Sequence, residues 1–186
     1  MKSGIRKVLA IGSLAIAIGA QSAMAGSVSV ELLGNGTYSM PVGTPTATRT
    51  FGYPGGGLNL NIHLGTKVAF QLGGHYATRV VTTDAAYTSK YVSGNAGFKL
   101  MLSRGFAFIV GGYYNRYFTD PFSLTGTDYG LSGGIGLTVP MGSSVGLYIS
   151  PMYHYSLSTL AYGAASTLTP HEIVGFAGLI FGGGSK

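Results

Sequence analysis

The sequence has no cysteine and very little charge, and each absence removes a class of protein. Because none of the 186 residues is cysteine, disulfide frameworks and cysteine-ligated metal sites are excluded. Charged residues make up 9% of the chain, against about a quarter in an ordinary soluble domain. Beyond residue 25 no apolar run approaches the roughly eighteen residues that a transmembrane helix needs.

The first 25 residues have the pattern of an export signal. A basic start precedes an apolar stretch and a small-residue cleavage site: Lys2, Arg6 and Lys7, then Val8–Ala20, then Ala23-Met24-Ala25. The apolar stretch is too short to span a membrane, so we predict a cleaved Sec signal peptide over residues 1–25. Its removal lowers the net charge from +6 to +3, and no run of five basic residues remains. The high pI is therefore no sign of a nucleic-acid partner.

The stretch Lys67–Val81 alternates between two kinds of side chain. One set is apolar apart from a tyrosine and a threonine: Val68, Phe70, Leu72, Gly74, Tyr76, Thr78 and Val80. The other is small, polar or charged: Lys67, Ala69, Gln71, Gly73, His75, Ala77 and Arg79. A period of two indicates a strand with unlike faces. Such a run can reach about 50 Å, which suits a strand that crosses a bilayer.

Seven further stretches alternate in the same way. The predicted strands are 26–39, 58–64, 67–81, 87–102, 106–117, 127–139, 145–157 and 170–181. Long and short connections alternate between them, which predicts a single all-β domain over 26–181, an eight-stranded antiparallel up-and-down transmembrane β-barrel. A short flexible tail, 182–186, is expected to follow. The facing of the strand 106–117 stays open, because Arg116 favours one face toward the lumen and Asn115 the other.

The aromatic residues support a membrane barrel independently. Most tyrosines fall at the strand ends beside the long connections, and Phe70, Phe98, Phe106 and Phe181 fall at the opposite ends. Amphipathic rings concentrate at the two interfaces of a bilayer. A soluble lipocalin-like barrel, the alternative fold, has no reason to sort its aromatics. In the membrane barrel the short turns are periplasmic and the long loops external.

At this point the chain resembles the small eight-stranded outer-membrane barrels, which include the OmpA-, OmpX- and opacity-type proteins. The resemblance rests on the signal peptide, the alternating strands and the closing run Ile173–Phe181. That run is similar to the signal by which these proteins address the barrel-assembly machinery, although here five residues follow Phe181. The resemblance implies a Gram-negative outer membrane as the location. It implies outer-membrane lipid and lipopolysaccharide as surroundings, and the assembly machinery as a partner.

Most of the charge lies on the faces predicted to point inward. Glu31, Lys67 and Lys99 fall near the periplasmic ends, and Arg79, Arg116 and Glu172 near the external ends. An eight-stranded barrel is just wide enough for side chains to fill it, so buried charges there must pair. We expect Glu31 beside Lys67 or Lys99, Glu172 beside Arg79 or Arg116, and a plugged lumen. The alternative is a narrow, porin-like ion path.

The sequence favours a structural or surface-interaction role for the external loops over an enzymatic one. The longest predicted loop, Met40–Gly56, carries Arg49, Phe51 and Tyr53 near its tip, a plausible contact surface for a host or phage ligand. His63, His75 and His171 have no acidic partner at ligand spacing, so neither a metal nor a cofactor is predicted.

A catalytic alternative remains open. Ser156, His154 and Glu172 fall on adjacent strands, where a serine, a histidine and a carboxylate can form a hydrolytic relay. The spacing also resembles the lipid A 3-O-deacylase barrels, whose stretch reads His-Tyr-Ser-Asn. Here Leu157 replaces the asparagine, which removes an oxyanion donor. The alternation also points His154 and Ser156 into the lumen unless a bulge at Pro151 reverses the facing.

Overall fold

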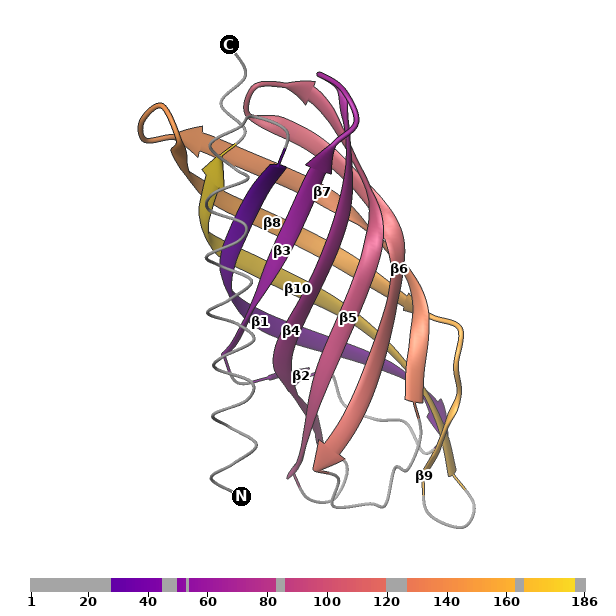
Figure 1. The fold of residues 1–186 in the computed structure, drawn as a ribbon. Coiled ribbons are helices and arrows are strands. Elements are labelled where there is room, and N and C mark those ends of the chain that lie inside the picture. The colour runs from indigo at the N-terminus through magenta and orange to yellow at the C-terminus, as the bar shows by residue number, and fades with distance from the viewer. Residues whose placement is uncertain are drawn as a thin grey trace, which may run out of the picture.

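The structure, a computed structural model, describes residues 28–44, 50–52, 54–82, 86–119, 127–162 and 166–182. Within them the chain forms one antiparallel sheet of eight long strands and two short ones (Figure 1). The long strands are β1 (Val28–Thr44), β3 (Gly55–His63), β4 (Val68–Thr82), β5 (Ala86–Ser103), β6 (Phe106–Thr119), β7 (Thr127–Pro140), β8 (Val145–Ser156) and β10 (Ser166–Gly182). The short strands are β2 (Thr50–Phe51) and β9 (Leu160–Tyr162).

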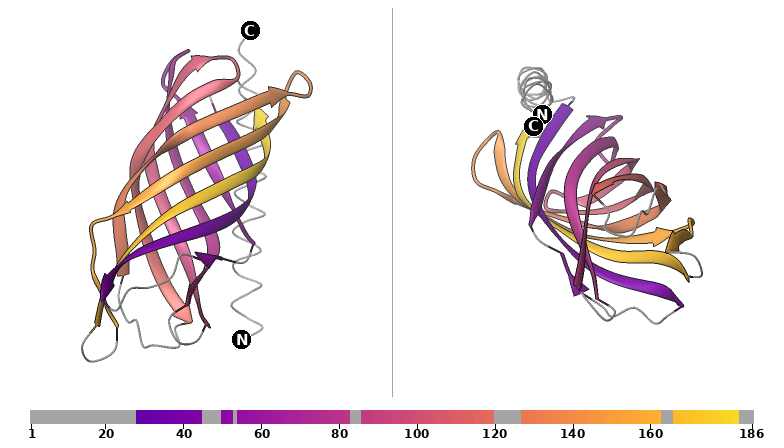
Figure 2. Two further views of the ribbon diagram at one scale, coloured as in Figure 1. Left: turned by 180° about the vertical axis from the view of Figure 1, so that it is seen from behind. Right: turned by 90° about the horizontal axis from the view of Figure 1, so that it is seen from below.

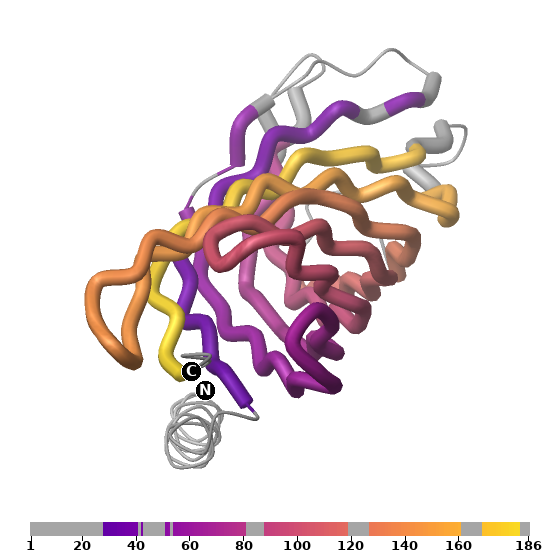
Figure 3. Tube along the Cα trace, turned by 90° about the horizontal axis from the view of Figure 1, so that it is seen from above, coloured from indigo at the N-terminus to yellow at the C-terminus, as the bar shows by residue number. Residues whose placement is uncertain are grey.

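The sheet closes on itself. Each long strand pairs with the next one along the chain, and β10 returns to β1 in a ladder from Ser29↔Gly182 to Thr44↔Thr167. The closed ring and the tilt of the strands can be followed in Figures 2 and 3. Closure leaves no unpaired edge between the long strands, and a strand-built membrane protein requires this because lipid offers no hydrogen bonds. Within the described ranges no helix has the length and apolar character to cross a membrane.

The connections sort to the two ends of the barrel, as the sequence predicts. Three short turns, 64–67, 104–105 and 141–144, lie at the upper end in Figure 1, which we call the short-turn end. The strand ends that the remaining connections join lie at the opposite end, which we call the long-loop end. Small outer-membrane barrels have this asymmetry, with the longer loops external.

The side chains alternate between an apolar outer wall and a polar lumen. Residues on the outer wall include Leu32, Leu72, Val92, Phe98, Leu100, Phe108, Val110, Leu131, Leu147 and Ile149, all exposed. Buried residues inside include Glu31, Asn61, Gln71, Arg79, Ser93, Lys99, Asn115, Asp128, His154 and Glu172. This is the inverse of a soluble barrel, so the lipocalin-like alternative is wrong and the predicted transmembrane architecture is confirmed.

Two predicted loops are shorter than the sequence suggests. β1 continues to Thr44 and β10 begins at Ser166, since the two strands stay paired beyond the predicted boundaries. The short strand β2 pairs with β1 through Tyr38↔Phe51, on the same side of β1 as β3. Gly52 donates its N–H to the Thr37 carbonyl at 2.8 Å, so part of the predicted loop Met40–Gly56 belongs to the barrel wall.

The open question of β6 is resolved by burial. Ile109, Tyr113 and Asn115 are buried, whereas Phe108 and Arg116 are exposed, so the odd-numbered set faces the lumen. In β8 the alternation continues without a break from Val145 to Ser156, and the register with β7 is the same on both sides of Pro151. Pro151 therefore does not reverse the facing.

Two predictions fall on residues outside the described ranges. The signal peptide, residues 1–25, lies outside them and stays a prediction. So does the predicted flexible tail from residue 183 onward, although Gly182 belongs to β10.

Candidate functional site in the barrel lumen

The first polar network in the lumen is organised by Glu31, and we call it the short-turn network. Glu31 is fully buried on β1, and its Oε1 accepts a hydrogen bond from Lys99 Nζ at 2.6 Å and one from Asn61 Nδ2 at 2.9 Å. Its Oε2 accepts from Asn59 Nδ2 at 2.8 Å and Gln71 Nε2 at 3.3 Å. Four donors from three strands thus converge on one carboxylate, which satisfies a buried charge that would otherwise be costly.

Lys99 is held from a second side by an aromatic ring. Its Nζ lies 4.2 Å from the centroid of Tyr148 on β8, within the range of a cation–π interaction. Because Lys99 comes from β5, the contacts with Glu31 and Tyr148 tie strands together across the bore. The ammonium therefore occupies space that ions would need in order to pass.

The second network, which we call the long-loop network, contains Glu172 on β10. Arg79 Nη2 donates to Glu172 Oε2 at 2.9 Å, and Tyr91 Oη lies 3.0 Å from Oε1. His154 Nδ1 lies 3.4 Å from the same Oε1. Arg79 also donates through Nη1 to Tyr117 Oη. The carboxylate and the guanidinium are both buried, so the pair is a salt bridge inside the lumen.

Asp128 on β7 completes this network, and the sequence reasoning missed it. Its two oxygens accept from Arg79 Nη2 at 3.4 Å and from four further donors. These are Tyr113 Oη at 3.2 Å, Asn115 Nδ2 at 3.0 Å, Ser156 Oγ at 2.7 Å and Ser158 Oγ at 2.9 Å. Asp128 has the parity of Gly130 and Ser132, the small inward set of its strand, and that signal could have found it.

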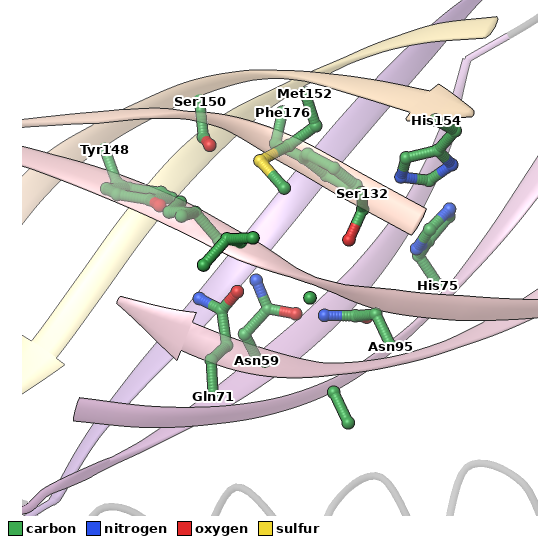
Figure 4. A pocket seen from close by; sticks show the side chains of 15 residues that line it. Asn59, Gln71, His75, Asn95, Ser132, Tyr148, Ser150, Met152, His154 and Phe176 are labelled. Carbon is green, nitrogen blue, oxygen red and sulfur yellow. The ribbon is translucent and has the colours of Figure 1, made fainter. Parts of the chain in front are cut away.

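A small cavity separates the two networks (Figure 4). The space open to the centres of water-sized molecules is about 20 Å³, enough for about one water. Three polar atoms of its lining residues have no hydrogen-bond partner among the described residues: His75 Nε2, Asn95 Oδ1 and Tyr148 Oη. A pocket of this size is too small for a metabolite. The lumen is thus filled at two levels with a gap for solvent between them.

Four of the six predicted lumen charges are where the sequence places them. The structure joins Glu31 to Lys99 and Glu172 to Arg79, each with one of its two expected partners. Lys67 lies exposed in the turn 64–67, and Arg116 lies exposed on the outer wall. For these two the predicted position in the lumen is wrong. Lys67 precedes the first residue of β4, and Arg116 belongs to the even-numbered residues of β6, which face away from the lumen.

The residues of the catalytic alternative are close together but differently connected. Ser156 and His154 both point into the lumen and are buried. Ser156 Oγ donates to Asp128, and no hydrogen bond joins it to His154 among the described residues. The His154 ring stacks on Tyr113, with centroids 4.3 Å apart and planes 14° apart. A serine held by a carboxylate, away from lipid, lacks the nucleophile–base contact of a hydrolytic relay.

The predicted loop surface is only partly described. Phe51 is 77% exposed and packs against Tyr38 with ring centroids 4.7 Å apart. Arg49 and Tyr53 lie outside the described residues. The described ranges also contain no group of three histidine, aspartate or glutamate side chains placed to hold a metal ion.

The fold and the site together define a transmembrane β-barrel whose lumen contains buried ion pairs. No family model and no curated protein matches the sequence. Solved structures do match. The outer membrane protein OprG from Pseudomonas aeruginosa superposes with a TM-score of 0.63 at 12% identity, over 83% of this chain and 95% of that one. Neisserial surface protein A gives 0.55 at 11% identity, over 83% and 96%. The chain thus has the fold of the small eight-stranded outer-membrane β-barrels, the group that its sequence resembles.

Proposed function

We propose that the protein is a structural or surface-interaction protein of a bacterial outer membrane, with a closed lumen and external contacts made at its long-loop end. The observation that carries the proposal is the pairing of an apolar outer wall with two buried charge networks. The wall fits a hydrocarbon environment. The networks fill two levels of the bore with bonded side chains, which supports a closed lumen.

The closed lumen directs any function to the outside of the barrel. A barrel that transports solutes needs an open bore, and eight strands leave room only for side chains unless the interior residues are small. Here four large interior residues form two ion pairs, Arg79 with Glu172 and Lys99 with Glu31. Breaking either pair by moving one partner would leave a buried charge at a cost of about 3–5 kcal/mol. Spontaneous opening of the bore is therefore rare.

The long-loop end offers the contact surface. Phe51 projects from the barrel wall at this end, on a strand held by β1. An exposed aromatic ring on a rigid support is a common anchor in protein recognition. Arg49 and Tyr53 flank it in the sequence and complete the proposed surface, whose partner would be a host or phage component.

Location and loop contacts are tested separately. Cells expressing the protein are fractionated, and membranes are extracted with detergent; we expect the protein in the outer-membrane fraction with a gel mobility that changes on boiling. Recovery in the soluble periplasm would refute the location.

For the contacts, Arg49→Ala/Phe51→Ala/Tyr53→Ala is compared with the unmodified protein for adhesion of whole cells to host cells and for phage adsorption. Lys67→Ala, at the opposite end, is the matched control. Full adhesion and adsorption in the triple variant would remove the loop from its proposed role.

A further inference from the structure

The charges of the described residues are segregated by sign. The described acids, Glu31, Asp128 and Glu172, are all buried in the lumen. The exposed charged residues of the described ranges are all cationic: Lys67, Lys90, Arg104 and Arg116. Lys67 and Arg104 lie in turns at the short-turn end. The outer wall at the long-loop end therefore carries positive charge with no described acid beside it.

Lys90 and Arg116 stand close together on that wall. Arg116 on β6 pairs with Val92 on β5, and Lys90 lies two residues from Val92 toward the long-loop end, on the same outer face. Diagonal neighbours on a sheet face are roughly 7–8 Å apart, so two such long side chains can converge on one anion. Neither residue makes an ion pair or hydrogen bond with the described residues, whereas Arg79 and Lys99 inside the lumen are both paired.

An aromatic surface lies directly beside the two cations. Phe118, the extra residue of a register shift in β6, stacks on Tyr76 with centroids 6.3 Å apart and planes 14° apart. Tyr114 and Tyr129 face each other across β6 and β7, each 50% exposed. The wall thus changes from aromatic to cationic within one or two residues along a strand. In a lipid leaflet the hydrocarbon is followed by a phosphorylated headgroup. The aromatic part of the wall therefore suits the edge of the hydrocarbon, and the cationic part suits the headgroup.

We propose that Lys90 and Arg116 form a binding site for a phosphate group of lipid A in the outer leaflet. The proposal rests on the proposed outer-membrane location, with the long-loop end outward. Lipid A is favoured over phospholipid because its glucosamine phosphates are monoesters. A phosphomonoester has a charge of about −1.5 to −2 and three acceptor oxygens, which matches two cations better than the single charge of a phosphodiester. Arg116 supplies the planar pair of donors and Lys90 the second charge.

Lipid binding to the folded barrel tests the site. Purified protein in detergent micelles is titrated with bisphosphorylated lipid A, and native mass spectrometry measures the bound fraction. We expect Lys90→Gln/Arg116→Gln to bind about thirtyfold more weakly than the unmodified protein, since each of the two cations near a lipid surface contributes about 1 kcal/mol. Lys67→Gln/Arg104→Gln, with the same loss of charge at the other end, should keep its affinity. With lipid A from which the phosphates have been removed, the two double variants should bind with equal affinity.

Three results would overturn the proposal: equal binding by the two double variants, undiminished binding of dephosphorylated lipid A, or equal binding of phosphatidylglycerol and lipid A. The last would assign the site to phosphodiester headgroups in general. Each variant is first checked for a heat-modifiable gel band, so that a folding defect is not mistaken for a binding defect. Failure of the proposed location is seen separately in the cell fractionation, which does not depend on lipid A affinity.

Discussion

Glu31→Gln is the most informative single change in the lumen, because it removes one charge and almost no volume. Glu31 accepts from Lys99, Asn59, Asn61 and Gln71, so its carboxylate is the common acceptor of the short-turn network. Glutamine replaces one acceptor oxygen by an NH₂ group that faces these donors. Lys99, only 5% exposed, then loses its counter-charge at 2.6 Å and stays buried.

The expected loss of stability follows from the uncompensated ammonium. Removing one partner of a buried ion pair costs about 3–5 kcal/mol, whereas an exposed pair contributes about 0–1 kcal/mol. Replacing both charges should cost less than replacing Glu31 alone, because Glu31→Gln/Lys99→Met leaves no buried charge and retains one amide oxygen as acceptor. We expect the two single changes to couple by about 2 kcal/mol or more in a double-mutant cycle.

The assay is urea unfolding of the barrel in lipid vesicles, followed by the gel shift between folded and unfolded bands. Lys67→Met serves as control, since Lys67 is exposed and should change the unfolding free energy by less than about 0.5 kcal/mol. A loss below about 1 kcal/mol for Glu31→Gln, or additive effects in the cycle, would show that water reaches the pair and that this level of the lumen is not closed.

Four further predictions concern the lumen and the wall. The unmodified protein should show no steady single-barrel conductance in a planar bilayer, and reproducible open channels would contradict the plugged lumen. His154→Ala should lower stability by about 1–3 kcal/mol through loss of contacts to Glu172 and Tyr113, measured by the same urea assay. The unmodified protein should leave the mass of lipid A unchanged in mass spectrometry, and loss of one acyl chain that Ser156→Ala abolishes would establish the catalytic alternative. Gly52→Ala should weaken the pairing of β2 with β1, because an added Cβ would lie 1.9 Å from the Thr78 carbonyl oxygen. The readout is increased proteolysis near residue 52. Gly36→Ala is the control, because a Cβ added there would have no atom within 4 Å.

The architecture was predictable because lipid-facing and lumen-facing residues of a membrane barrel alternate along each strand, which gives the sequence a period of two. In β4 the predicted inward set includes Gln71, His75 and Arg79, and all three are buried. Where the alternation of apolar and polar residues fits either facing of a strand, the facing could not be predicted. At the start of β6 both alternate sets are apolar, and toward its end Arg116 and Asn115 favoured opposite facings. Burial in the folded barrel decided between them, with Asn115 buried and Arg116 exposed.

The site was harder to predict than the fold, because periodicity gives the facing of a residue but not its partner across the bore. Asp128 illustrates this limit. It opens β7 next to a predicted loop, and its partners Ser156 and Ser158 come from the other side of a hairpin. The extension of β1 to Thr44 was hidden for a different reason, because proline, glycine and threonine in that stretch resemble a loop. Pairing with β10 overrides those local preferences.

The abundant glycine and the large bonded side chains of the lumen are two aspects of one packing solution. A bore of eight strands cannot hold large side chains on every inward position, so each large residue needs a small one opposite it. A Cβ added at Gly73 would lie 1.8 Å from Asn59 Oδ1, and one at Gly136 would lie 2.8 Å from Tyr148 Oη. Asn59 holds Glu31, and Tyr148 carries Lys99 over its ring. The glycines therefore make room for the residues that fill the bore, and a larger residue at either position would displace a member of the short-turn network.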